Sequence, residues 1–115
     1  MSDLKKIWSD AVLLKTASIK EVIQNLTETS FKISIVANDI GEFEGTVSDG
    51  DIRRALLKGL ELESPIENIV NRNAFVVTPK LERDLVLQLM IANKIQQIPI
   101  VDDENKMTRI FLVVC

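Results

Sequence analysis

The sequence repeats one pattern of helical and extended segments twice. Each copy has a helical segment followed by two extended ones, at residues 18–26, 32–36 and 43–47 in the first copy and 81–94, 98–101 and 107–114 in the second. Apolar residues three and four positions apart indicate the helices, and alternating or β-branched apolar residues indicate the strands. The copies align at an offset of about 64 residues, so the chain is an internal tandem. In this alignment, 33–36 lies over 98–101 and 42–45 lies over 106–109.

The first copy begins with a helix-start signal. Ser18 is followed three residues later by Glu21, which is the pattern of a capping box. The polar stretch 61–73 separates the copies and is interpreted as a connector. We therefore expect one domain at residues 1–62, which includes an N-terminal arm, and a second at 63–115, which includes the connector.

Composition excludes several classes of function. The chain has 115 residues, of which 46% are hydrophobic and 27% charged, as in a globular protein with one compact core. The net charge of -3 and the absence of a basic stripe argue against nucleic acid as a partner. No apolar stretch approaches the roughly 20 residues of a membrane helix, so we expect no membrane span and a cytoplasmic location. The chain has no histidine and one cysteine, Cys115, which excludes nucleophile arrangements that need histidine and zinc sites built on either residue type. We do not expect an autonomous enzyme.

One segment carries most of the chemistry. Residues 45–54 read Gly-Thr-Val-Ser-Asp-Gly-Asp-Ile-Arg-Arg and lie where a strand turns into a helix. Free backbone N–H groups at a helix start attract phosphate, and the segment places a hydroxyl, two carboxylates and two guanidiniums beside them. This combination fits a nucleotide. The alternative is that Ser48 and Asp51 form only a capping box.

The two arginines of this segment offer a phosphate clamp, because a guanidinium presents a fork of donors. We expect either Arg53 or Arg54 to act in this way, but not both. The alternative for each arginine is a solvated ion pair with a nearby acidic residue.

The tandem and its motif together resemble a known family. The signature Gly-x-hydrophobic-Ser/Thr-x-x-Asp is present at 45–51, and the second copy contains the strand Ile-Pro-Ile-Val-Asp at 98–102. A tandem with these elements resembles a pair of CBS domains, the Bateman module that binds adenosine nucleotides and related ligands. The resemblance implies an α+β fold in which each copy is a small, mostly antiparallel sheet packed on two helices. The second copy is expected to be incomplete at its C-terminus.

The resemblance also implies roles for particular residues. Ser48 would approach the phosphate and Asp51 the ribose hydroxyls, while Gly45 would keep the adjoining strand free of a side chain where the ligand approaches. The site residues implied or inferred from the motif are Gly45, Thr46, Ser48, Asp51, Arg53, Arg54 and, from the segment before the first helix, Lys15 and Thr16. AMP or ATP is the implied ligand, and no cofactor is required.

The second copy departs from the signature. Arg109 replaces the glycine and Leu112 the Ser/Thr, so one ligand site per chain is expected. The first copy departs too, since the alignment places Ser34 where the second copy has Pro99.

The parent protein is suggested by residues 46–59 and 65–73. They are similar to the CBS pair fused to bacterial sugar nucleotidyltransferases, and arabinose-5-phosphate isomerases carry a similar run. Because the sequence ends on an apolar segment, we expect a piece of a longer protein. It would regulate a C-terminal catalytic domain by binding a nucleotide. The alternative is an interaction module without ligand binding. Apolar residues surround the helix at 81–94 almost completely, which predicts a homodimer through this helix. The alternative is a central core helix.

Overall fold

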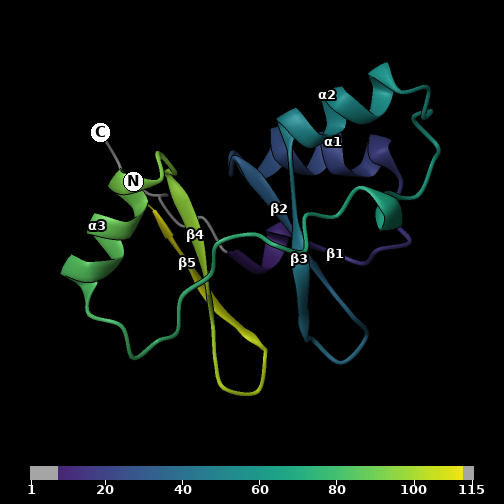
Figure 1. Ribbon diagram of the computed structural model, residues 1–115. Helices are drawn as coiled ribbons and strands as arrows, with labels where there is room; N and C mark the ends of the chain where they lie inside the picture. The colour runs from purple at the N-terminus through teal and green to yellow at the C-terminus, as the bar shows by residue number, and fades with distance from the viewer. Residues whose placement is uncertain (1–7, 113–115) are drawn as a thin grey trace.

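The computed structural model describes residues 8–112, which form two lobes that follow the two sequence copies (Figure 1). The first lobe contains a 3-10 helix, three strands and two helices, namely η1 (Trp8–Ala11), β1 (Val12–Leu13), α1 (Ile19–Thr29), β2 (Ile33–Ala37), β3 (Phe43–Ser48) and α2 (Asp49–Leu57). The second contains α3 (Arg83–Ala92), β4 (Gln97–Val101) and β5 (Met107–Leu112), and the short helix η2 (Ile66–Asn68) lies between the lobes in sequence. The mixed α+β class expected from the sequence is confirmed.

Local signals explain where the helices begin. Ser18 caps α1 by accepting a hydrogen bond from the Glu21 backbone at 3.1 Å, and Glu21 accepts from the Ser18 backbone at 2.9 Å. This is the predicted capping box. The helix expected at 81–94 is shorter, at Arg83–Ala92, and its N-cap, Glu82, makes no side-chain cap hydrogen bond. The beginning of the expected N-terminal arm and the end of the strand expected at 107–114 lie outside the described residues. None of the helices within residues 8–112 is long and apolar enough to cross a membrane.

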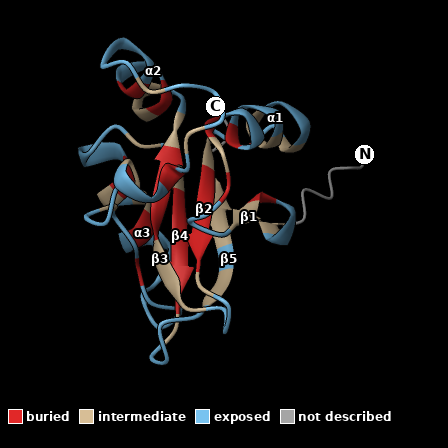
Figure 2. Ribbon diagram, turned by 90° about the vertical axis from the view of Figure 1, so that its right-hand side faces the viewer, coloured by how far each residue is buried: buried red, intermediate tan, exposed pale blue. Residues whose placement is uncertain are grey.

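Each lobe has its own small sheet. In the first, β1 pairs in parallel with β2, which pairs antiparallel with β3. In the second, β4 pairs antiparallel with β5, and Val77 makes an isolated parallel bridge with Ile100. Val77 thus takes the place in the second lobe that β1 holds in the first. Helices cover one face of each sheet, and the buried strand residues lie in β2, β3 and β4 (Figure 2).

The strand registers correct the alignment of the two copies. Val36 lies opposite Gly45, and Ile100 lies opposite Arg109, with an irregularity directly after each pair. A constant offset of 64 residues relates these positions (36 and 100, 45 and 109), so Ile35, not Ser34, occupies the place of Pro99. Shifting a strand by one residue exchanges its two faces.

The side chain of Ser34 confirms this correction. Its hydroxyl donates to Asn25 Oδ1 of α1 at 2.8 Å, so it points to the helical face of its sheet. Pro99, in contrast, points away from α3 toward the first lobe.

The connector belongs structurally to the first lobe. Ile66 is completely buried in the core that α1, α2 and β3 share, and its backbone N–H donates to Ala17 O at 2.9 Å. Further along, Asn71 and Thr46 exchange two backbone hydrogen bonds, at 2.8 and 3.2 Å. The connector thus runs beside β3 and then crosses to the second lobe.

The lobes also contact each other directly. At the hairpin ends, the Phe43 backbone N–H donates to Asn105 O at 2.7 Å, and Asn105 Nδ2 donates to Phe43 O at 3.0 Å. At the opposite end, the Lys32 backbone donates to Gln97 Oε1 at 2.7 Å. These contacts fix how β3 and β4 face each other, and therefore what lies between them.

Candidate functional site

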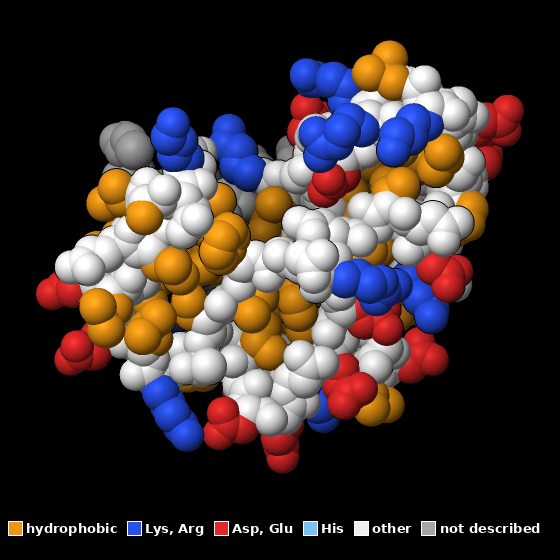
Figure 3. Space-filling model, in the orientation of Figure 1, with side chains coloured by type: hydrophobic (Ala, Val, Ile, Leu, Met, Phe, Trp, Pro, Cys, Tyr) orange, Lys and Arg blue, Asp and Glu red, His pale blue; other side chains and the backbone are white. Residues whose placement is uncertain are grey.

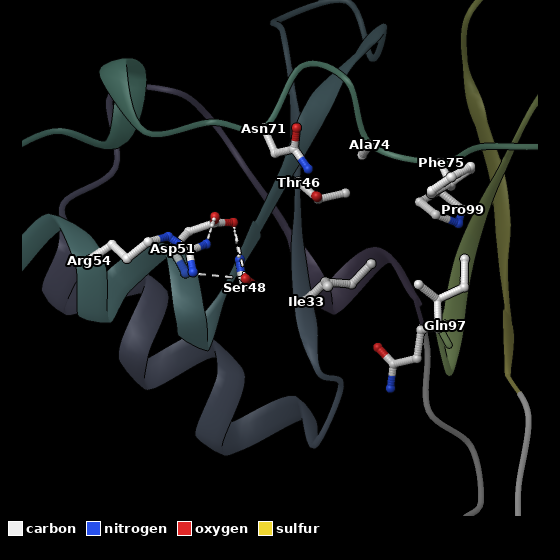
Figure 4. A pocket seen from close by; sticks show the side chains of 11 residues that line it. Ile33, Thr46, Ser48, Asp51, Arg54, Asn71, Ala74, Phe75, Gln97 and Pro99 are labelled. Carbon is white, nitrogen blue, oxygen red and sulfur yellow. Dashed lines mark hydrogen bonds and ion pairs between the residues drawn. The ribbon is translucent and has the colours of Figure 1, made fainter. Parts of the chain in front are cut away.

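A pocket of about 260 Å³ opens between the two lobes. Side chains from β3 and α2 lie on one side of it, and side chains from the crossing segment and β4 lie on the other (Figure 4). It is lined by Ile33, Thr46, Ser48, Asp51, Arg54, Asn71, Ala74, Phe75, Ile95, Gln97 and Pro99. The structure thus brings Thr46, Ser48, Asp51 and Arg54 of the predicted site together in one cavity.

Ser48 and Asp51 form the capping box of α2. Asp51 Oδ2 accepts from the Ser48 backbone N–H at 2.9 Å and from Ser48 Oγ at 3.0 Å, and Ser48 Oγ accepts from the Asp51 backbone at 3.2 Å. The capping interpretation of the motif is therefore correct as a description of this structure. The capping box does not involve Asp51 Oδ1, and the side chains of Ser48 and Asp51 still line the pocket.

The structure separates the two arginines. Arg54 Nη2 donates to Asp51 Oδ1 at 2.8 Å and lines the pocket. Arg53 pairs with Asp49 at 3.0 Å on the exposed side of α2 and is not among the residues that line the pocket. Arg54 is therefore the arginine that lines the pocket. Each arginine is paired with an acidic residue, as the ion-pair alternative expected, and Arg53 makes its pair outside the pocket.

Gly45 has a packing role that the sequence did not reveal. A Cβ added at this position would lie 2.5 Å from Asn71 O and 2.6 Å from Val70 Cγ1. The space beside Gly45 is therefore taken by the connector. Gly45 lets the connector lie against β3, and this contact puts Asn71 on the pocket wall.

Lys15 and Thr16 lie in a different hollow. They line a cavity of about 250 Å³ together with Leu14, Ala37, Asn38, Asp39 and Glu44. Lys15 Nζ also lies 3.9 Å from Glu67 Oε2. The structure therefore does not bring these two residues to the pocket of Ser48 and Asp51.

Sequence reasoning missed the apolar wall of the pocket. Ile33 comes from β2, whereas Phe75, Ile95 and Pro99 come from the second copy. A planar base can pack against such side chains, and Pro99 is almost completely buried while Phe75 is half exposed. Only the proline-containing strand signalled this wall in the sequence.

The second copy does not reproduce the polar groups. By the registers of the two sheets, Ile110 and Leu112 stand where the first copy has Thr46 and Ser48. Neither can bind a phosphate or a ribose hydroxyl through its side chain. The position related to Asp51 is Cys115, which lies outside the described residues.

Comparison with known proteins agrees with this architecture. A model of the CBS domain matches residues 3–58 and 66–111. An uncharacterised protein of Helicobacter pylori (strain J99) is 33% identical over 112 residues, which are 92% of this chain and 32% of that protein. The arabinose 5-phosphate isomerase GutQ of Salmonella typhi is 27% identical over 97 residues, which are 84% of this chain and 30% of the isomerase.

A solved structure shows the same arrangement. The CBS domain protein PAE2072 from Pyrobaculum aerophilum, complexed with AMP, has a TM-score of 0.75 and 21% identity, and the match covers 88% of this chain and 78% of that chain. The chain belongs to the CBS domain family and contains two copies of the domain. It spans about a third of the length of the two curated relatives.

Proposed function

We propose that the pocket between the lobes binds an adenosine nucleotide such as AMP or ATP. The observation that carries the proposal is one cavity that joins a hydroxyl, a carboxylate and a guanidinium, from Ser48, Asp51 and Arg54, to an apolar wall. These groups match the phosphate, the ribose and the base of a nucleotide. The volume of about 260 Å³ lies just below the range for small-molecule sites, roughly 300–1,000 Å³. The AMP complex of PAE2072 supports this choice of ligand.

Thermal unfolding with AMP, ADP, ATP, GTP and CMP tests the proposal. At a ligand concentration of 100 Kd, binding to the folded state alone stabilises it by about 2.7 kcal/mol, so the Tm rises measurably. Asp51→Asn keeps the shape of the side chain but removes its charge and one acceptor, and we expect it to weaken binding by roughly 10- to 100-fold.

The matched control is Asp49→Asn. Asp49 lies in the same turn of α2 but pairs with Arg53 outside the pocket, so this variant should bind as the wild type does. If none of the nucleotides shifts the Tm, or if both variants lose binding equally, the proposal is wrong.

We propose further that the module regulates an attached catalytic domain. Ligand binding between two lobes can shift their arrangement if the ligand prefers one state. A sugar nucleotidyltransferase is our first proposal for the parent enzyme and an arabinose-5-phosphate isomerase the second. Both act on sugar phosphates, and the similarity to GutQ supports the second. We place such an enzyme in the cytoplasm, where its nucleotide ligand is found.

We also propose that the chain forms a homodimer through α3. This helix buries Val86 and Met90 against its own sheet but leaves Leu85 45% and Ile91 72% exposed. Hydrophobic side chains gather over this lobe in the space-filling view (Figure 3). An exposed apolar helix face of this kind is typical of a protein interface.

Light scattering over a dilution series tests the dimer. We expect the wild type to dissociate on dilution, and Ile91→Glu to raise the dimer Kd by roughly 100-fold because it would bury an unpaired charge. Leu57→Glu is the control, since Leu57 is 82% exposed on α2 in the other lobe. A wild type that is monomeric at every concentration would contradict this proposal and would also remove the support for an interaction module.

A further inference from the structure

The Asp51 carboxylate has about four lone pairs that can accept hydrogen bonds. The number already in use decides how many donors of a ligand it can bind. Ser48 N–H and Ser48 Oγ take two of them on Oδ2, and Arg54 Nη2 takes one on Oδ1. One acceptor position therefore remains, while the cis-diol of a ribose presents two donors.

Arg54 is the partner that can leave. The bonds from Ser48 belong to the cap of α2, and losing a cap costs about 1 kcal/mol of stability. The side chain of Arg54 is 66% exposed and that of Asp51 20% exposed, so water can solvate the guanidinium when it leaves, and breaking this pair costs less than breaking a fully buried one. A ribose can thus displace Arg54 from Oδ1 more readily than it can displace Ser48.

The guanidinium of Arg54 packs beside the start of α2. A Cβ placed on Gly50 would lie 3.4 Å from Arg54 Nη1 and 3.6 Å from Nη2, so the guanidinium lies along the first turn of the helix. Free backbone N–H groups at a helix start attract phosphate. A phosphate held by these groups would lie beside the turn of α2 against which the guanidinium packs.

We propose that Arg54 changes partners, from Asp51 Oδ1 to the phosphate of the ligand, and thereby makes the site select phosphorylated nucleosides over unphosphorylated ones. This inference rests on the proposed nucleotide site. A nucleoside that takes both acceptor positions on Asp51 separates Arg54 from its carboxylate and offers it nothing in return. A nucleotide replaces the lost carboxylate with a phosphate, which a guanidinium binds through two parallel hydrogen bonds.

Calorimetric titration with AMP and adenosine measures this selection. For the wild type, we expect AMP to bind roughly 100-fold more tightly than adenosine, of which roughly tenfold comes from Arg54 and the rest from the backbone N–H groups at the start of α2. In Arg54→Gln, the affinity for AMP should fall by roughly tenfold and the affinity for adenosine should stay constant or rise, because Asp51 is then free of its partner. The ratio of the two affinities is the decisive quantity.

Arg53→Gln is the matched control, because it removes the same charge from the next position of α2. It should leave the ratio at its wild-type value, which separates a local exchange from a general effect of positive charge. An equal loss of affinity for AMP and adenosine in Arg54→Gln, or an unchanged ratio, would overturn the exchange while the nucleotide site stands. If neither ligand binds the wild type, the proposed function fails and this inference fails with it.

Discussion

Replacing Gly45 by alanine is expected to destabilise the chain by about 3–5 kcal/mol. The new methyl group would lie 2.5 Å from the backbone oxygen of Asn71, far inside contact distance. The connector must then move away from β3, which breaks the two backbone hydrogen bonds between Thr46 and Asn71. Overpacking typically costs about 1–3 kcal/mol and each lost backbone hydrogen bond about 1 kcal/mol.

Urea unfolding measures this change, with Gly50→Ala as the matched control. A Cβ at Gly50 would make only ordinary contact with the flexible end of Arg54. Because Gly50 lies inside α2, alanine should leave stability unchanged or raise it by up to about 1 kcal/mol. The displaced connector also carries Asn71, so Gly45→Ala should weaken nucleotide binding. If the free energy of unfolding of Gly45→Ala lies within about 0.5 kcal/mol of the wild-type value, the contact with the connector does not constrain this strand.

Much of the local structure could be predicted because its causes are local. Ser18 with Glu21 and Ser48 with Asp51 are pairs three residues apart, and each forms the box that its spacing predicted. The hairpins followed from alternating strands around a polar turn. In both turns, one side chain, Asn38 or Asp102, accepts from the backbone two and four residues later.

The rest of the site depends on contacts between distant segments, and no short pattern encodes these. Asn71, Phe75 and Ile95 meet Ser48 only because the connector crosses between lobes that face each other. The strand alignment failed by one residue because the pattern Ile-x-Ile-Val occurs at both 33–36 and 98–101. This likeness matched the strands at an offset of 65, whereas the registers of the two sheets relate them at 64.

Gly45 illustrates the difference between recognising a signal and explaining it. A glycine inside a strand indicates that something approaches the backbone closely. The sequence predicted a ligand there, whereas the structure places Val70 and Asn71 beside it. The prediction that something lies close to the Gly45 backbone was correct, but the neighbour is the connector and not a ligand. Either neighbour would exclude a side chain at this position.

In the connector, Ile66→Ala is expected to destabilise the chain by about 2–5 kcal/mol. Ile66 is completely buried among residues of α1, α2 and β3, so truncation leaves a cavity in the core of the first lobe. Leu57→Ala is the control, as an 82% exposed side chain should change stability by less than about 0.5 kcal/mol. Urea unfolding of both variants measures the difference. Since the connector positions Asn71 in the pocket, Ile66→Ala should weaken nucleotide binding even where the protein is still folded. If Ile66→Ala lowers the free energy of unfolding by less than about 1 kcal/mol, the connector is not part of the cooperative core of the first lobe. The contact beside Gly45 would then keep the connector against β3 by itself.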